Sequence, residues 1–75
     1  MSFPFDTSPA TLWTLTREDK SASCEVSFVP NGVQARVTRN GRLLYSRVFA
    51  SGDETLEWAE RERNEHIAKG WATAR

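Results

Sequence analysis

Residues 22–48 have the sequence ASCEVSFVPNGVQARVTRNGRLLYSRV, and their pattern of apolar residues and turn residues is the main evidence for the predicted fold. Apolar and polar residues alternate over 22–29 and again over 33–39, which is typical of strands with one buried and one solvent-facing side. Two Asn-Gly pairs, Asn31-Gly32 and Asn40-Gly41, interrupt the apolar runs. Asn-Gly supplies the positive φ angles of a tight hairpin, so each pair predicts a reversal of the chain.

The two predicted hairpins agree on which side chains share a face. A two-residue loop at Asn40-Gly41 pairs Val37 with Leu44, and one at Asn31-Gly32 pairs Val26 with Val37. Because strand side chains alternate between faces, the valines are expected to form the buried face. The opposite, outer face is then expected to carry Glu25, Ser27, Gln34, Arg36, Thr38, Leu43, Tyr45 and Arg47.

Outward from this core, residues 12–17 predict a first strand, and a fourth strand follows the second corner and ends at Phe49. Residues 51–54, Ser-Gly-Asp-Glu, match the capping box that begins a helix, and Gly70 fits the left-handed position just after a helix end. The predicted fold is therefore α+β: a four-stranded antiparallel β-meander packed on one face by a single C-terminal α-helix. Leu56, Ala59, Arg63 and Ile67 follow the spacing of a buried helical stripe.

The chain is expected to form one domain over residues 11–71. Residues 1–10 carry two prolines and no periodicity, and they predict an N-terminal arm that is either loose or lies on the domain through Phe3 and Phe5. Residues 72–75 are expected to be a loose tail. A chain of 75 residues buries a smaller share of its surface than a larger domain, so the core is expected to be thin.

Composition argues against several classes of protein. No apolar run approaches the roughly 18 residues of a membrane span, and the first residues lack the basic and apolar regions of a secretory signal. A single cysteine excludes an intramolecular disulfide. These features favour a cytoplasmic protein with no membrane partner.

The sequence contains no recognisable catalytic or metal-binding pattern. It has no glycine-rich phosphate loop and no zinc-ligand spacing, and His66 is its single histidine. Cys24 falls on the inner face of a predicted strand, where nothing lowers a thiol pKa. We therefore expect a protein that is not an enzyme and uses no cofactor or metal.

Five residues are candidates for binding a partner: Arg36, Leu43, Tyr45 and Arg47 on the outer sheet face, and Trp58 on the helix. Arginine, tyrosine and tryptophan are the residue types most enriched in binding hot spots. Trp58 falls at the edge of the predicted buried stripe, where it either anchors a partner or covers the rim of the core. The outer face likewise supports two interpretations, a recognition surface or an ordinary solvated face stabilised by cross-strand pairs.

The leading hypothesis is a small non-catalytic protein-interaction module that binds another protein, or a second copy of itself as a homodimer, through the outer sheet face. Nucleic-acid binding through the same face is the alternative, because residues 33–48 hold four arginines and no acidic residue. The net charge of the chain is zero, however, which leaves little attraction for a phosphate backbone.

Two resemblances accompany this interpretation. Residues 35–65, a strand, Asn-Gly, a strand ending in Phe49 and a capped helix, resemble the end of the arm-type DNA-binding domain of phage integrases. That resemblance implies a sheet lying in the major groove, with Arg36, Tyr45 and Arg47 facing the DNA. The whole chain, with Phe49-Ala50-Ser51 before the helix and Gly70-Trp71 after it, also resembles small bacterial and phage proteins of meander-plus-helix form.

Overall fold

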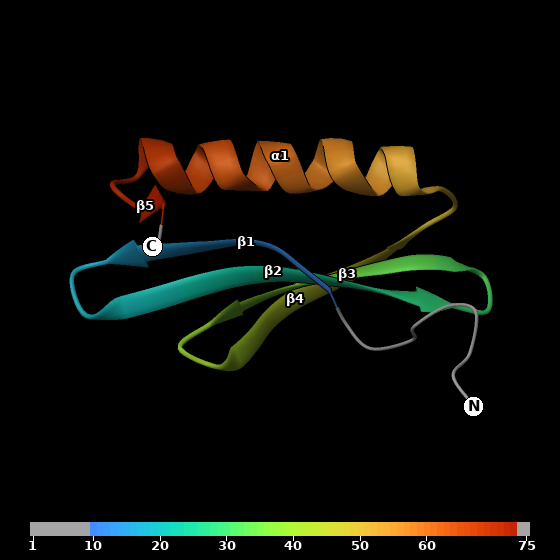
Figure 1. The fold of residues 1–75 in the computed structure, drawn as a ribbon, viewed down its shortest axis with the longest axis horizontal. Coiled ribbons are helices and arrows are strands. Elements are labelled where there is room, and N and C mark those ends of the chain that lie inside the picture. The colour runs from blue at the N-terminus through green and yellow to red at the C-terminus, as the bar shows by residue number, and fades with distance from the viewer. Residues whose placement is uncertain (1–9, 74–75) are drawn as a thin grey trace, which may run out of the picture.

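A computed structural model of the chain describes residues 10–73. In chain order, the elements are β1 (Ala10–Arg17), β2 (Lys20–Val29), β3 (Gly32–Arg39), β4 (Arg42–Phe49), α1 (Gly52–Ala68) and β5 (Ala72–Thr73). All neighbouring strands pair antiparallel, and the strand order across the sheet is β4-β3-β2-β1-β5. The helix lies along one face of the sheet (Figure 1). The predicted α+β meander with one C-terminal helix is therefore confirmed, whereas the expectation for residues 1–9 falls outside the described residues.

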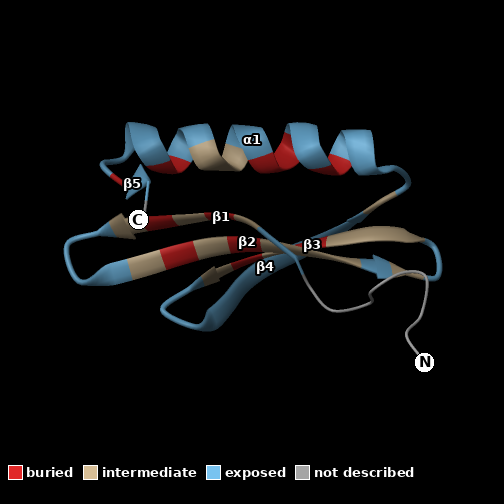
Figure 2. Cartoon of the chain, in the orientation of Figure 1, coloured by how far each residue is buried: buried red, intermediate tan, exposed pale blue. Residues whose placement is uncertain are grey.

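The core lies between α1 and the sheet, where the buried residues of the two layers face each other (Figure 2). It consists of Trp13, Leu15, Ala22, Cys24, Ala35, Val37, Trp58, Ala59 and Trp71. One of its largest side chains links distant parts of the chain, because the indole Nε1 of Trp13 on β1 donates a hydrogen bond to the backbone carbonyl of Ala59 on α1 at 3.0 Å. The small side chain of Ala59 leaves room for this close approach of β1 to the helix.

Both predicted helix ends are confirmed. Ser51 is the N-cap, and its hydroxyl accepts a hydrogen bond from the Glu54 amide at 3.3 Å. At the other end, Gly70 has a φ of +101°, and its amide donates to the Ile67 carbonyl at 3.0 Å. The Trp71 amide donates to the His66 carbonyl at 3.1 Å, which completes a Schellman motif.

Residues 72 and 73 form a strand, in contrast to the expected loose tail, of which residues 74–75 lie outside the described residues. Trp71 is buried after the Schellman turn, and Ala72 and Thr73 then form β5, which pairs with Thr16 and Leu15 of β1. The glycine turn sends the chain back toward the sheet, and the buried indole of Trp71 holds it there.

The first hairpin turns one step earlier than predicted. Val29 pairs with Gly32, so the two loop residues are Pro30 and Asn31, and Val26 pairs with Ala35 instead of Val37. Gly32 serves a different purpose from the expected turn position. A Cβ built at Gly32 would lie 2.0 Å from the Phe49 carbonyl oxygen, so glycine allows β3 to begin directly against the end of β4. Each β2 residue therefore pairs with a β3 residue two positions earlier than predicted. Because side chains alternate with a period of two, the predicted buried face of β2 is unchanged.

The second hairpin contains an unpredicted β-bulge. The Asn40-Gly41 turn forms as expected, with φ of +53° and +80°, and Thr38 pairs with Leu43. The next pair is Val37 with Tyr45, so Leu44 is an extra residue in β4. From Tyr45 onward, every side chain of β4 therefore lies on the face opposite to the one predicted.

The helix is rotated relative to the predicted stripe. Its buried residues are Thr55, Trp58, Ala59 and His66, whereas Leu56 and Ile67 are 55% and 39% exposed. Trp58 packs against Phe49 at a ring-centroid distance of 5.6 Å, and burying this large ring outweighs burying the smaller Leu56. Within residues 10–73, no helix combines the length and apolarity that crossing a bilayer would require.

The two hairpin glycines predict different costs of substitution. Gly32→Ala should lower the free energy of unfolding by at least about 2 kcal/mol, because the new Cβ would collide with the Phe49 backbone. Gly41→Ala is the matched control, since a Cβ there meets nothing within 4 Å and only the positive φ is penalised, by about 1 kcal/mol. Urea unfolding of the two variants measures the difference, and equal losses would contradict the close approach at Gly32.

Candidate functional site

The outer face of the sheet carries less of the expected recognition surface than predicted. Arg36 and Leu43 lie on this face, as expected, and Leu43 is 54% exposed. Arg36 lies opposite Ser46 on β4 and opposite Glu25 on β2, so an acidic residue adjoins the one arginine that β3 presents here. The rest of the face is mainly serine and threonine: Thr14, Thr16, Ser21, Ser23, Ser27 and Thr38.

Tyr45 does not lie on the outer face, which corrects the prediction. The bulge at Leu44 turns Tyr45 toward the helix, where its ring meets the Trp58 ring edge-on at a centroid distance of 6.0 Å. The Tyr45 hydroxyl donates a hydrogen bond to the Glu62 carboxylate. Partial burial, this hydrogen bond and the negative charges of Glu62 and Glu65 raise the pKa of Tyr45 well above its ordinary value.

Arg47 is also on the helix side of the sheet, for the same reason. It pairs with Ala35, a core residue, and its guanidinium lies 5.2 Å from the centroid of the Phe49 ring. Arg39 is on that side too, with its guanidinium 5.2 Å from the centroid of the Trp71 ring. The arginines of residues 33–48 are therefore divided between two faces and do not form one basic surface.

Trp58 is not an exposed anchor. Its side chain is 8% exposed and lies on the sheet side of the helix, where it contacts the rings of Tyr45 and Phe49. The sequence allowed Trp58 either to anchor a partner or to cover the rim of the core. The structure supports packing in the core, and it places Trp58 deeper than the rim.

The most exposed part of the meander is its edge strand β4, and not the predicted outer face. We call residues 42–48 of this strand the β4 edge. Every residue of the β4 edge is exposed, and within the described part of the chain its outer side has no strand partner. Its large apolar side chains Leu43, Leu44 and Val48 are 54%, 43% and 44% exposed, and Tyr45 is 41% exposed. Leu43 and Val48 share the outer face, whereas Tyr45 and Arg47 share the helix face.

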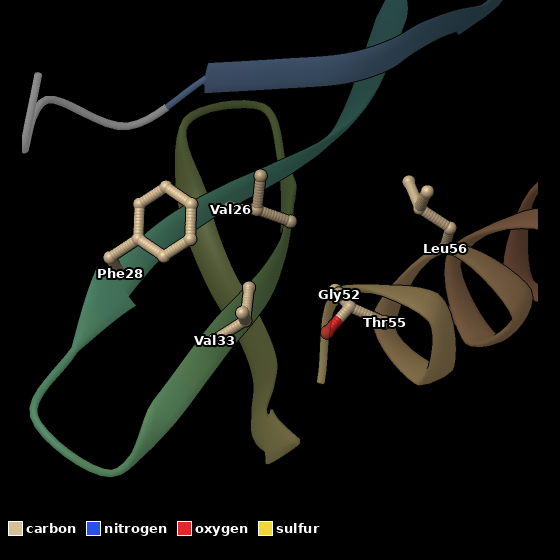
Figure 3. Close-up of a pocket in the computed structure, with 6 residues that line it drawn as sticks. All are labelled: Val26, Phe28, Val33, Gly52, Thr55 and Leu56. Carbon is tan, nitrogen blue, oxygen red and sulfur yellow. The ribbon is translucent and has the colours of Figure 1, made fainter. Parts of the chain in front are cut away.

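A shallow apolar pocket of about 170 Å³ lies at the start of the helix. Val26 and Phe28 of β2 and Val33 of β3 lie on one side of it, and Thr55 and Leu56 of the first helical turns lie on the other (Figure 3). Phe28 is 69% exposed, so the helix leaves this end of the inner sheet face uncovered. The alternation over residues 22–29 places Phe28 on the buried face together with Cys24 and Val26, and the sequence contains no signal for how far along the sheet the helix reaches.

The reactive side chains outside these surfaces are enclosed in the core. Burial, followed by the charges of Glu62 and Glu25, raises the pKa of the Cys24 thiol to about 11, so it is protonated and weakly nucleophilic at neutral pH. His66 is 6% exposed, lies between the Trp13 and Trp71 rings, and its Nδ1 lies 2.8 Å from the Glu62 carbonyl oxygen. Its Nε2 has no hydrogen-bond partner among residues 10–73, where no cluster of three metal-ligating side chains is found.

Comparison with known proteins identified no similar protein. No protein-family model matches the chain, and neither the curated proteins nor the solved structures include a significant match.

The position of Tyr45 can be tested directly, because it is the single tyrosine of the chain. A spectrophotometric titration of the tyrosinate absorbance should place its pKa well above the ordinary value of about 10. Since folding raises this pKa, Tyr45 contributes stability that is fully present below pH about 10 and is lost as the pH rises further. A tyrosine exposed on the outer face would titrate near its ordinary value, and that result would contradict the bulged register.

Glu62→Gln should move the Tyr45 pKa back toward the ordinary value, because it removes the negative charge that the hydroxyl faces. Glu60→Gln is the matched control: Glu60 lies on the same helix but contacts Arg63 at 3.7 Å. An equal shift in both variants would show that the helix acts on Tyr45 through its overall charge and not through Glu62.

Proposed function

We propose that this chain is a small non-catalytic protein-binding module that binds by strand addition at the β4 edge. This proposal moves the binding surface from the outer sheet face as a whole to its last strand. The observation that carries it is the uninterrupted exposure of residues 42–48: among residues 10–73 no strand pairs with the outer side of β4, and Leu43, Leu44 and Val48 are exposed. An unpaired edge of this kind is a template on which another extended chain can add a strand.

The two ends of the sheet differ in how they are protected. At one end, β5 has two residues and pairs with Leu15 and Thr16 of β1, so within the described chain the longest unpaired run there is the five residues 10–14 of β1. At the other end, β4 has eight residues and no proline, and although it carries two arginines and one bulge, its other six residues are uncharged. The contrast supports β4 as the binding edge.

The absence of catalysis is part of the proposal. The thiol of Cys24 and the imidazole of His66 are both enclosed, and no described pocket brings polar side chains together around a reacting atom. The free cysteine fits a reducing compartment, and we place the protein in the cytoplasm.

Nucleic-acid binding, the alternative, gains no support from the geometry. It requires several arginines on one open face to neutralise successive phosphates, whereas Arg36 lies on the outer face and Arg39 and Arg47 lie on the helix side, each against an aromatic ring.

Affinity capture with edge variants tests the proposed function. The immobilised chain is exposed to a native-host lysate that also contains a differently tagged copy of the chain, and every retained protein is quantified. Leu43→Lys and Val48→Lys should each reduce retention of the bound protein at least about tenfold, because a lysine on an edge strand opposes pairing. Both residues are exposed in the free chain, so neither variant should impair folding.

Ile67→Lys is the matched control, because it also places a lysine at a partly exposed apolar position, on α1. Retention should be unchanged in this variant. If the wild-type chain retains nothing, or if all three lysine variants lose binding equally, the β4 edge is not the binding surface.

A further inference from the structure

We propose that the partner of the β4 edge is a second copy of this chain, paired antiparallel through β4 in a two-fold symmetric dimer centred on Ser46. This inference rests on the proposed function and specifies its partner. The two five-stranded sheets would then join into one continuous sheet with both helices on the same side, because a two-fold axis perpendicular to the sheet preserves its faces.

The bulge makes the faces of β4 compatible with self-pairing. Leu43 and Val48 are five positions apart and would normally point to opposite faces, but the extra residue Leu44 puts both on the outer face. When the pairing is centred on Ser46 and Leu44 again remains unpaired, Leu43 lies opposite Val48 of the second copy. Tyr45 lies opposite Arg47 of the second copy on the helix face, so the side chains of every pair share a face.

Repulsion between like charges disfavours the two neighbouring registers of the β4 pairing and favours the one centred on Ser46. A pairing centred on Arg47 places Arg47 directly opposite its own copy. A pairing centred on Tyr45 places Arg42 opposite Arg47, again two like charges, which destabilise a cross-strand pair. The register centred on Ser46 has no like charges opposite one another.

The same register offers Arg47 an acidic partner. Tyr45 donates its hydroxyl to Glu62, so an arginine lying opposite Tyr45 also approaches this carboxylate. Within residues 10–73 of a single chain, neither Arg47 nor Glu62 forms an ion pair. The Arg47 guanidinium of one copy and the Glu62 carboxylate of the other are therefore complementary in charge, and this complementarity favours a second copy as the partner.

Cysteine cross-linking tests the register. In Ser46→Cys the two new thiols lie directly opposite each other, at the Cα separation that a disulfide spans, and mild oxidation should convert the protein to a covalent dimer. Val48→Cys is the matched control, because its two copies would be about 13 Å apart along the strands, too far for a disulfide. Cys24 is fully buried in both variants and does not compete.

We expect Ser46→Cys to cross-link at least about tenfold faster than Val48→Cys. Cross-linking of Val48→Cys at an equal or greater rate would overturn the register centred on Ser46.

Sedimentation equilibrium from about 5 μM to about 500 μM tests the dimer itself, a range suited to a weak interface. The wild-type chain should shift from monomer to dimer with concentration. Arg47→Glu should weaken association at least about tenfold, because it sets a carboxylate beside Glu62 of the other copy. Arg36→Glu makes the same charge change on the outer face of β3 and should leave association unchanged.

Equal weakening by Arg47→Glu and Arg36→Glu would overturn the proposed pairing. A wild-type chain that stays monomeric at every concentration would overturn the second copy as partner. That result would leave the proposed function standing if the capture experiment still retained a different protein in a manner sensitive to Leu43→Lys.

Discussion

The bulge at Leu44 determines which side chains of β4 lie beneath the helix. Without it, Tyr45, Arg47 and Phe49 would point to solvent, and Ser46 and Val48 would take their places beneath the helix. Trp58 would then lose both of its aromatic neighbours on β4. A bulge costs a local interruption of the hydrogen-bond ladder, whereas aromatic rings bury the largest areas of any side chains. The packing around Trp58 therefore outweighs a regular ladder.

Strands β1 to β4 and helix α1 could be predicted because each has a local signal, whereas β5 could not. The Asn40-Gly41 turn, the Ser51 cap and the Gly70 turn depend on residues within a few positions of one another. The register could not be predicted in the same way. Gly32 is needed because the Phe49 carbonyl approaches it from β4, and nothing in the neighbouring sequence records that contact. The rotation of the helix depends likewise on Trp58 meeting Phe49, a contact between two elements.

The candidate site shows how a single shift in register changes a functional interpretation. The positions of Arg36 and Leu43 were predicted correctly, because both precede the bulge or lie on its partner strand. Tyr45 and Arg47 follow the bulge, and both were assigned to the wrong face. The run of arginines that suggested a basic surface becomes a set of separate contacts, including those of Arg39 with Trp71 and Arg47 with Phe49. A charge cluster in a sequence predicts a charged surface only when the register of every strand in it is known.

The exposed apolar residues follow from the size of the two layers. A helix of 17 residues is about 26 Å long, whereas the ten residues of β2 extend about 33 Å. One helix therefore cannot cover the inner face of a five-stranded sheet, and Phe28 at one end and the β4 edge at one side are left exposed. A larger domain would cover such surfaces with further elements of its own chain. Among residues 10–73, β4 therefore presents both exposed apolar side chains and backbone groups that no neighbouring strand pairs.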